Sequence, residues 1–334
     1  MTSRETILDL FSGKKIKTQP AFSGLIHITS EGLQNEGLVF HEVHQDAHKM
    51  ARAAAGTFKL SGLPSAVAPL DMLVEAEAIG SPIDFRENGE FAFPRTVKPI
   101  FSSTKLITSE IGDNFEILNR GRIRLVCEAL ELLKEDIGRE AVIGGMIHGP
   151  FTLLLFLIEP GGLFADMKRD PDAVQAALSN LASFLARVGQ AYRNAGADFI
   201  TIHDMGGSPG FIGPAKYEQF AYPAEKLLIT QLLAPRVLSV CGNTNKSMHL
   251  LAQTGADAIS VDQVNDLTGS RSVLSDTLLF GNVDPVEVLW QGDASGVTAA
   301  VRRAKEAGVD AVWPGCDLVP QTPMENIKVL LQAP

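Results

Sequence analysis

The 334-residue sequence contains only three cysteines, Cys127, Cys241 and Cys316, and they lie far apart in the chain. Three separated cysteines cannot form the disulfide framework of a small secreted domain, so each is treated as a single thiol. Cys127 lies in the helical apolar pattern RIRLVCEALELL and is interpreted as a small core residue. Cys241 and Cys316 remain as the thiols that could carry chemistry.

Basic residues and long apolar runs are also scarce. The 29 lysines and arginines are outnumbered by 39 acidic residues, and the formal net charge of -10 argues against nucleic acid as a partner. The longest apolar run, Phe151 to Ile158, is about half the length of a bilayer span, and Met1 to Gln19 lacks a signal-peptide core. We therefore expect a cytoplasmic protein with no membrane partner.

A helical segment, a glycine and a short apolar strand follow one another three times in the second half of the chain. These strands begin after Gly196, Gly255 and Gly308, and glycine is suited to the left-handed cap that ends a helix. Five further apolar runs bring the predicted strands to eight, at Phe22–His27, Ala66–Leu70, Ala141–Ile147, Val237–Cys241 and Thr277–Gly281. Helical patterns separate most of them, at 46–56, 122–138, 171–196, 214–233, 246–254, 295–308 and 323–331.

Near-continuous apolar strands alternating with amphipathic helices favour a parallel sheet that is covered on both faces. Eight such strands favour the α/β class, with a closed (β/α)8 TIM barrel rather than an open doubly wound sheet. No GxGxxG motif follows any strand, which weakens the dinucleotide-binding form of the open sheet. We expect residues 1–334 to form a single barrel domain, with 1–20 as an N-terminal extension and 71–119 as a loop elaboration over one mouth.

A polar residue lies at the end of every predicted strand. Reacting groups in this fold come from the carboxyl ends of the strands, so these side chains should converge on one mouth. Each of them alone could equally cap the next helix or be a satisfied loop residue. The strand-end residues are His27, Asp71, His148, His203 with Asp204, Cys241 with Asn243, Asp262, Asn282 with Asp284, and Cys316 with Asp317.

The two remaining cysteines suggest a metal site at that mouth. Cys241 ends the fifth predicted strand and Cys316 the eighth, so both thiols should open onto the same rim although 75 positions separate them. Thiolates are good zinc ligands, but a structural zinc site needs four ligands and a catalytic site typically three. Candidates for the missing ligands are His203, Asp204, Asp262 and Gln263.

Several motifs in order resemble the methylcobamide:coenzyme M methyltransferase branch of the uroporphyrinogen decarboxylase superfamily. They are HKMARAA, LVEAEAIG, GGMIHGPFTLL, LSVCGNTN, GADAISVDQ, LLFGNVDP and VWPGCDLVPQTPMENIKVL, and the match runs from about Ala21 to Leu331. The resemblance implies a (β/α)8 barrel. It also implies that a nucleophile bound in the barrel takes a methyl group from a corrinoid carried by a separate protein.

Thiol-methylating members of this branch imply a zinc ion held by a His-x-Cys pair, an acidic residue and a late cysteine. Cys241 and Cys316 match the two cysteines, but Ser239 stands at the histidine position and Gln263 at the acidic one. Neither serine nor glutamine is a good zinc ligand, so zinc binding is in doubt unless His203 or Asp262 substitutes. The N5 amine of tetrahydrofolate needs no metal to be a nucleophile, so tetrahydrofolate is favoured over a thiol such as coenzyme M as acceptor.

The residue roles that follow from this interpretation form three groups. Asp204, Asn243, Asp262 and Asn282 are expected to be catalytic, His148, His203 and Asp284 to bind cofactor, and Cys241 and Cys316 to be an incomplete metal-ligand set. Glu75 and Glu77 rank below these strand-end residues.

Three other functions stay open. Uroporphyrinogen decarboxylase is disfavoured because Pro20 to Thr29 contains no arginine to bind a substrate with eight carboxylates. Methyl transfer in the opposite direction, from a methylated small molecule to the corrinoid, is the second. The third is a non-catalytic barrel that binds only a corrinoid partner or a ligand.

Overall fold

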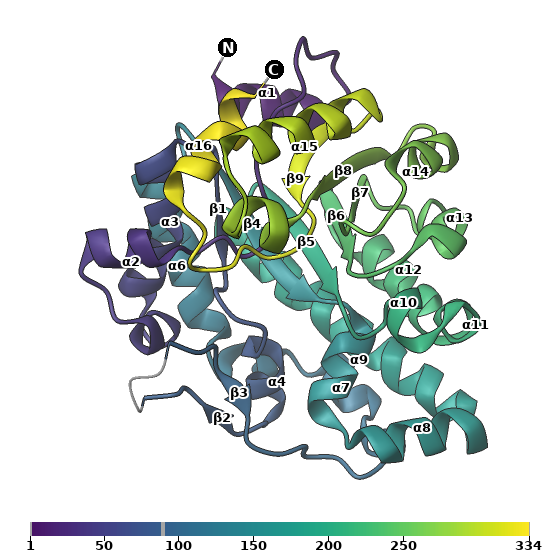
Figure 1. Ribbon diagram of the computed structural model, residues 1–334. Helices are drawn as coiled ribbons and strands as arrows, with labels where there is room; N and C mark the ends of the chain where they lie inside the picture. Colours follow the sequence, from purple (N-terminus) through teal and green to yellow (C-terminus); the bar gives the residue numbers. More distant parts are fainter. Residues whose placement is uncertain (1, 88–90, 334) are drawn as a thin grey trace.

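The computed structural model describes residues 2–87 and 91–333 of the chain. Its centre is a curled sheet of seven parallel strands in the order β1-β4-β5-β6-β7-β8-β9, surrounded by helices (Figure 1). The strands of this sheet are β1 Ser65–Ala68, β4 Val142–His148, β5 Phe199–Asp204, β6 Arg236–Val240, β7 Ala258–Val261, β8 Leu278–Val283 and β9 Ala311–Pro314. The fold is therefore mixed α/β and resembles a TIM barrel.

Helices connect successive strands of the sheet and cover its outer face. Within the described residues, none of them has the length and hydropathy of a membrane span. The α-helices are α1 Ser3–Phe11, α2 Ser30–Glu36, α3 Ala47–Ser61, α4 Val74–Ile79, α5 Ser109–Asp113, α6 Ile123–Asp136, α7 Pro150–Leu157, α8 Pro160–Arg169, α9 Pro171–Asn194, α10 Pro209–Ile212, α11 Pro214–Lys216, α12 Tyr222–Gln231, α13 Met248–Leu251, α14 Leu267–Leu274, α15 Ala294–Glu306 and α16 Met324–Gln332. Short 3-10 or π segments occur at Phe40–His44, Thr104–Leu106, Phe115–Asn119, Tyr217–Ala221, Asn245–Ser247 and Pro285–Trp290.

Seven of the eight predicted strands and their parallel pairing are confirmed, but the strand expected at 22–27 is wrong. This segment lies between β9 and β1 but forms no ladder within the described residues, and an isolated bridge from Ala21 to Val312 just precedes it. The Oγ atom of Ser23 accepts a hydrogen bond from the N–H of Leu25 at 3.1 Å, which bends the backbone out of a ladder. A Cβ at Gly24 would collide with the ring of Trp313, so the bend also fits the close packing there.

The interior of the curled sheet is aromatic at its amino-terminal end. The rings of Phe22 and Trp313 lie 5.1 Å apart in an edge-to-face arrangement, and those of Phe280 and Trp313 lie 5.0 Å apart. Helix α1 covers this end with apolar side chains, and both chain termini lie near it (Figure 1). The buried members of this interior cluster are Ile7, Leu10, Phe22, Leu25, Val142, Phe199, Val237, Ala258, Phe280, Ala311 and Trp313.

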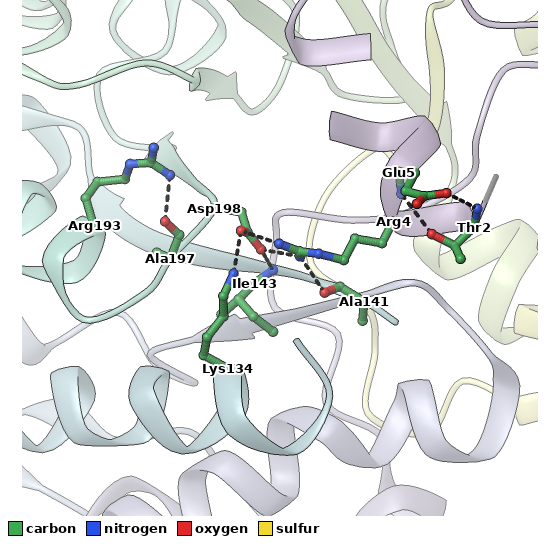
Figure 2. A network of polar contacts seen from close by, with 9 residues as sticks. All are labelled: Thr2, Arg4, Glu5, Lys134, Ala141, Ile143, Arg193, Ala197 and Asp198. Atoms are coloured by element: carbon green, nitrogen blue, oxygen red, sulfur yellow. Dashed lines mark hydrogen bonds and ion pairs between the residues drawn. The ribbon is translucent and has the colours of Figure 1, made fainter. Parts of the chain in front are cut away.

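An ion pair ties α1 to the sheet, as Figure 2 shows. The guanidinium of Arg4 donates to both oxygens of Asp198, at 2.6 and 2.7 Å, and to the carbonyl of Ala141 at 2.8 Å. Asp198 also accepts from Lys134 and from the N–H of Ile143, each at 2.8 Å. Because a bidentate arginine–carboxylate pair has a fixed geometry, it orients the helix against the ends of β4 and β5.

The interval expected as an irregular loop, 71–119, contains α4, α5 and a small antiparallel pair, β2 Ile83–Asp84 with β3 Arg95–Thr96. Arg122, at the start of α6, holds the 71–119 interval through two ion pairs. The guanidinium lies 2.6 Å from carboxylate oxygens of both Asp71 and Glu77, and Asp71 also lies 3.0 Å from Nδ1 of His44. This buried cluster positions the chain that leaves β1, where the sequence pattern predicted no regular structure.

We expect Asp198→Ala to lower the free energy of unfolding by about 3 kcal/mol, since it leaves a partly buried Arg4 without its partner. Burial alone would raise the pKa of Asp198. The hydrogen bonds from Arg4 and Lys134 outweigh burial, so the pKa lies below its ordinary value and the carboxyl is ionised in the folded state. The difference from wild type should be complete above about pH 4 and shrink at lower pH, as the carboxylate takes up a proton. Urea titrations at several pH values measure it.

The matched control is Asp9→Ala in α1, the helix that carries Arg4. Asp9 pairs with an exposed lysine, Lys14, and such surface pairs contribute less than about 1 kcal/mol. Equal losses in the two variants would show that the Arg4–Asp198 pair has no special role.

Candidate functional site

Three potential donor side chains meet on the inner face of the sheet at its carboxyl end. His203 is in β5, Cys241 follows β6 directly, and Cys316 lies just after β9. Side chains alternate along a strand, so His203 shares a face with Phe199, and Cys241 with Val237, which are both members of the interior cluster. The three side chains therefore lie on the same inner face as the aromatic cluster, nearer to the open end of the sheet.

The donor atoms of these three residues are close together. Nε2 of His203 lies 3.1 Å from Sγ of Cys241, and that sulfur lies 3.3 Å from Sγ of Cys316. One ligand atom from each residue lies within 4.8 Å of the other two. His203 is fully buried, whereas both cysteines are partly exposed, so solvent reaches the cluster from the thiol side.

The electrostatics of the cluster separate charge between its members. The hydrogen bond from Cys241, reinforced by His203, lowers the pKa of the Cys316 thiol well below its ordinary value. The same bond, together with burial, raises the pKa of Cys241. Burial lowers the pKa of His203, but the charges of Asp317 and Cys316 outweigh it and raise the pKa to about 9. These shifts favour a negative charge on Cys316 beside a positive charge on His203.

This donor set fits a zinc ion. Zinc is bound in proteins by thiolate and imidazole, and three protein ligands with a fourth position open is the arrangement of its catalytic sites. Zinc bonds of about 2.3 Å to sulfur and about 2.0 Å to nitrogen put tetrahedral donors roughly 3.5 to 3.8 Å apart. The observed separations of 3.1 and 3.3 Å are slightly shorter, so a small outward movement of the side chains accommodates the ion.

Ser239 and Gln263, where the resemblance implies a histidine and an acidic ligand, both lie beside the cluster. Ser239 is the register partner of His203 in the ladder between β5 and β6, so the two side chains lie on the same face of neighbouring strands. His203, expected to bind cofactor, thus supplies an imidazole next to the position where the resemblance implies one. The Oε1 atom of Gln263 is buried close to Gly315 and has no hydrogen-bond partner among the described residues.

Asp204, predicted to be catalytic, is fully buried and organises the loops that follow β4 and β5. Its Oδ1 accepts from Oγ1 of Thr152 at 2.6 Å and from the N–H of Gly207 at 2.7 Å. Burial raises the pKa of Asp204, and burial beside Asp204 raises that of Glu225 well above its ordinary range. Glu225 in turn accepts from the hydroxyl of Tyr217 at 2.6 Å. A catalytic role for Asp204 stays a prediction.

Asp262 and Asn282, also predicted to be catalytic, belong to a network centred on Asn265. Asp262 accepts from the N–H of Gly242 at 2.9 Å, and Asn282 donates to the carbonyls of Asp262 and Asn265 at 3.2 and 3.1 Å. Asn265 donates to the carbonyls of Gly242 and Asp262 at 2.9 and 3.0 Å. The network joins the loop after β6 to the one after β7. Asn265 was missed because an asparagine before a helix cap carries no distinguishing sequence signal.

Asn243 and Asp284 each accept a backbone hydrogen bond within their own turns. Asn243 accepts from the N–H of Asn245 at 3.2 Å, and Asp284 from that of Val286 at 2.8 Å. These bonds explain why an amide and a carboxylate stand at the two turns. The expected roles, catalytic for Asn243 and cofactor-binding for Asp284, stay predictions.

His148, predicted to bind cofactor, is the last residue of β4 and the register partner of His203. It is buried, and its Nδ1 lies 2.8 Å from a carboxylate oxygen of Glu75 in α4. Its ring also packs edge-on against Phe156, with the centroids 5.4 Å apart. Glu75, ranked low from its sequence context, therefore belongs to the buried polar layer next to His203. Cofactor binding by His148 stays a prediction.

The chain matches the family described as Uroporphyrinogen decarboxylase (URO-D) over residues 2–334. It is 29% identical to a methylcobamide:CoM methyltransferase, MtbA, of Methanosarcina acetivorans, and 30% identical to MtbA of Methanosarcina mazei. Each of these matches covers 99% of this chain and 97% of the relative.

A solved structure of a methyltransferase from Methanosarcina mazei superposes with a TM-score of 0.93 at 26% identity. The superposition covers 100% of this chain and 98% of that one, so the whole fold is shared. The resemblance seen in the sequence motifs is confirmed, and corrinoid-dependent methyl transfer is the activity supported by these relatives. The chain belongs to the uroporphyrinogen decarboxylase family.

Proposed function

We propose that this protein transfers a methyl group from a methylcorrinoid, held by a partner protein, to a small thiol at a zinc–thiolate site. The convergence of His203, Cys241 and Cys316 carries the proposal, because it places three zinc-type donors within 4.8 Å of one another at the open end of the sheet. The relatives named as methylcobamide:CoM methyltransferases support the methyl donor class and the need for a corrinoid-binding partner.

The preference for a thiol reverses the order of acceptors expected from the sequence. Tetrahydrofolate was favoured because Ser239 and Gln263 left the ligand set incomplete. With the imidazole of His203 at 3.1 Å from Cys241, three ligands are available, which is the number that catalytic zinc sites use. An acceptor thiol gains from such a site because its pKa is near 8.5, whereas the N5 amine of tetrahydrofolate is already unprotonated.

A zinc ion at this site would lower the pKa of the acceptor thiol and hold it as a thiolate. The chain itself contributes the placement of the donors. The ladder between β5 and β6 fixes His203 and Cys241 on one face, and the aromatic interior below them excludes water from that side. Cys241 and Cys316 are partly exposed. The sulfur of an acceptor thiol bound beside them would therefore be accessible to a methyl donor that approaches from the carboxyl edge.

Metal content provides the first test. Protein purified without chelator should contain about one zinc ion per chain, and a Cys241→Ala, Cys316→Ala double variant should contain almost none, because it loses two of three ligands. Cys127→Ala is the matched control, since Cys127 is a half-buried thiol of helix α6 and should not affect the metal. Elemental analysis of the three proteins gives the answer, and metal-free wild type would overturn the zinc site.

Acceptor choice is tested by calorimetry and by turnover with methylcobalamin as donor. We expect coenzyme M to bind the zinc-loaded protein and to be methylated, and tetrahydrofolate to do neither, because only a thiol gains from the metal. Binding and methylation of tetrahydrofolate by metal-free protein would support the alternative acceptor. Tight binding of a corrinoid partner without methylation of either compound would indicate a non-catalytic barrel.

The histidine assignment can be tested by moving the imidazole between strands. His203→Ser should weaken zinc binding by more than about 100-fold. This is more than the loss expected for a residue that contacts a ligand but not the metal. Adding Ser239→His puts an imidazole on the register partner and should restore part of the affinity. Competition with a chromophoric chelator measures the zinc Kd, and Ser239→Ala serves as control because serine is not a ligand. An unchanged Kd in His203→Ser would contradict the assignment.

A further inference from the structure

Asp317, next to Cys316 in the chain, lies between the imidazole of His203 and the segment that takes the place of the expected first strand. One carboxylate oxygen, Oδ1, accepts a hydrogen bond from the N–H of Ile26 at 2.8 Å. The other oxygen, Oδ2, lies 4.0 Å from Nδ1 of His203. The carboxylate is thus held at one end and faces the histidine with the other.

The imidazole of His203 needs such a partner. The ring is fully buried, and its Nδ1 has no hydrogen-bond partner among the described residues, while Nε2 faces Cys241. A histidine that binds a metal through Nε2 must carry its proton on Nδ1, and a carboxylate or carbonyl that accepts this proton fixes the ring. Asp317 is placed to be that acceptor, after a movement of about 1 Å that brings the pair to ordinary hydrogen-bond length.

Two neighbouring acids are placed differently. Asp204 directly follows His203 in β5, so its side chain lies on the other face of the sheet, although its Oδ2 has no hydrogen-bond partner among the described residues. Asp204 accepts from Thr152 and Gly207, and Asp262 accepts from the N–H of Gly242. Among the described residues, Asp317 is the acid that lies within ion-pair distance of His203. Asp317 is therefore the carboxylate that faces the imidazole and has an oxygen placed to accept its proton.

We propose that Asp317 is a positioning residue that fixes the Nδ1–H tautomer of His203 and aims Nε2 at the position between the two cysteines. The inference rests on the proposed zinc site, and it assigns a role to a residue outside the ligand set. The anchor is rigid, because the chain on both sides of Asp317 is bound: Leu318 donates to the carbonyl of Ile26 at 2.9 Å, and Gly315 to that of Val283 at 2.8 Å. The N-terminal segment thereby helps to define the metal site.

Asp317→Asn and Asp317→Ala together distinguish positioning from simple structural support. In the Asn variant the N–H of Ile26 keeps the amide oxygen, so the amide NH2 faces His203 and favours the tautomer with the proton on Nε2. With its proton on Nε2, the ring cannot bind a metal through that atom, which is the one that faces the cysteines. Zinc binding should therefore weaken by about 10- to 100-fold. In the Ala variant water can serve Nδ1, so the loss should be smaller although the contact with Ile26 is gone.

The measurements are the zinc Kd by chelator competition and the visible spectrum of cobalt(II)-substituted protein. The Asn variant should keep the thiolate charge-transfer bands but change its ligand-field bands, since the imidazole is the ligand affected. Asp293→Asn, at the exposed N-cap of α15, is the matched control and should leave both readouts unchanged. Thermal unfolding with excess chelator verifies that each variant is folded.

The outcomes separate this inference from the proposed function. Wild type that binds no zinc would overturn the zinc site itself. Zinc binding in wild type with an equal Kd in Asp317→Asn would overturn the positioning role alone. A larger loss in Asp317→Ala than in Asp317→Asn would show that the contact with Ile26, and not the tautomer of His203, is what matters.

Discussion

The in-register pairing of β5 with β6 is the constraint on which the site depends. It sets His203 opposite Ser239, and alternation along β6 then brings Cys241 to the same face. His203 lies in this ladder, and the N–H of Cys241 donates to the carbonyl of Asp204 at 3.3 Å, so the backbone of both residues is held. The curl of the sheet brings Cys316, four neighbouring strands away from β5 in the order of the sheet, to 3.3 Å from Cys241.

The interior below the site gives this arrangement a fixed base. The aromatic rings of Phe22, Phe280 and Trp313 fill the amino-terminal half of the curled sheet, and α1 covers them with apolar side chains. These buried rings occupy the interior below the site, and the polar groups above them lie toward the open end. The Arg4–Asp198 pair holds the covering helix in place and so contributes to the site from the far side of the sheet.

The sequence pattern was sufficient for those features that depend on local signals. Three glycine stops and four further apolar runs located the seven strands, and strand ends then placed Cys241 and Cys316 on one edge. The segment 22–27 looked like a strand because its residues are apolar, but the bend at Ser23 depends on contacts with Ser65 and Leu25. Glu225 and Arg122 reach the buried layers from helices, and no local pattern distinguishes them from surface charges.

The 3.3 Å distance between Sγ of Cys241 and Sγ of Cys316 determines which chemistry suits the open end of the sheet. Two thiolates so close would repel each other strongly, and the pKa shifts accordingly favour a proton on Cys241 and a second proton on His203, beside a negative charge on Cys316. A divalent cation makes both protons unnecessary, because it neutralises two thiolates and accepts a neutral imidazole. A third sulfur, from an acceptor, can then join the same ion, whereas an amine that is already nucleophilic has nothing to gain from it. The proposed zinc site and the proposed preference for a thiol thus rest on the same arrangement of charge.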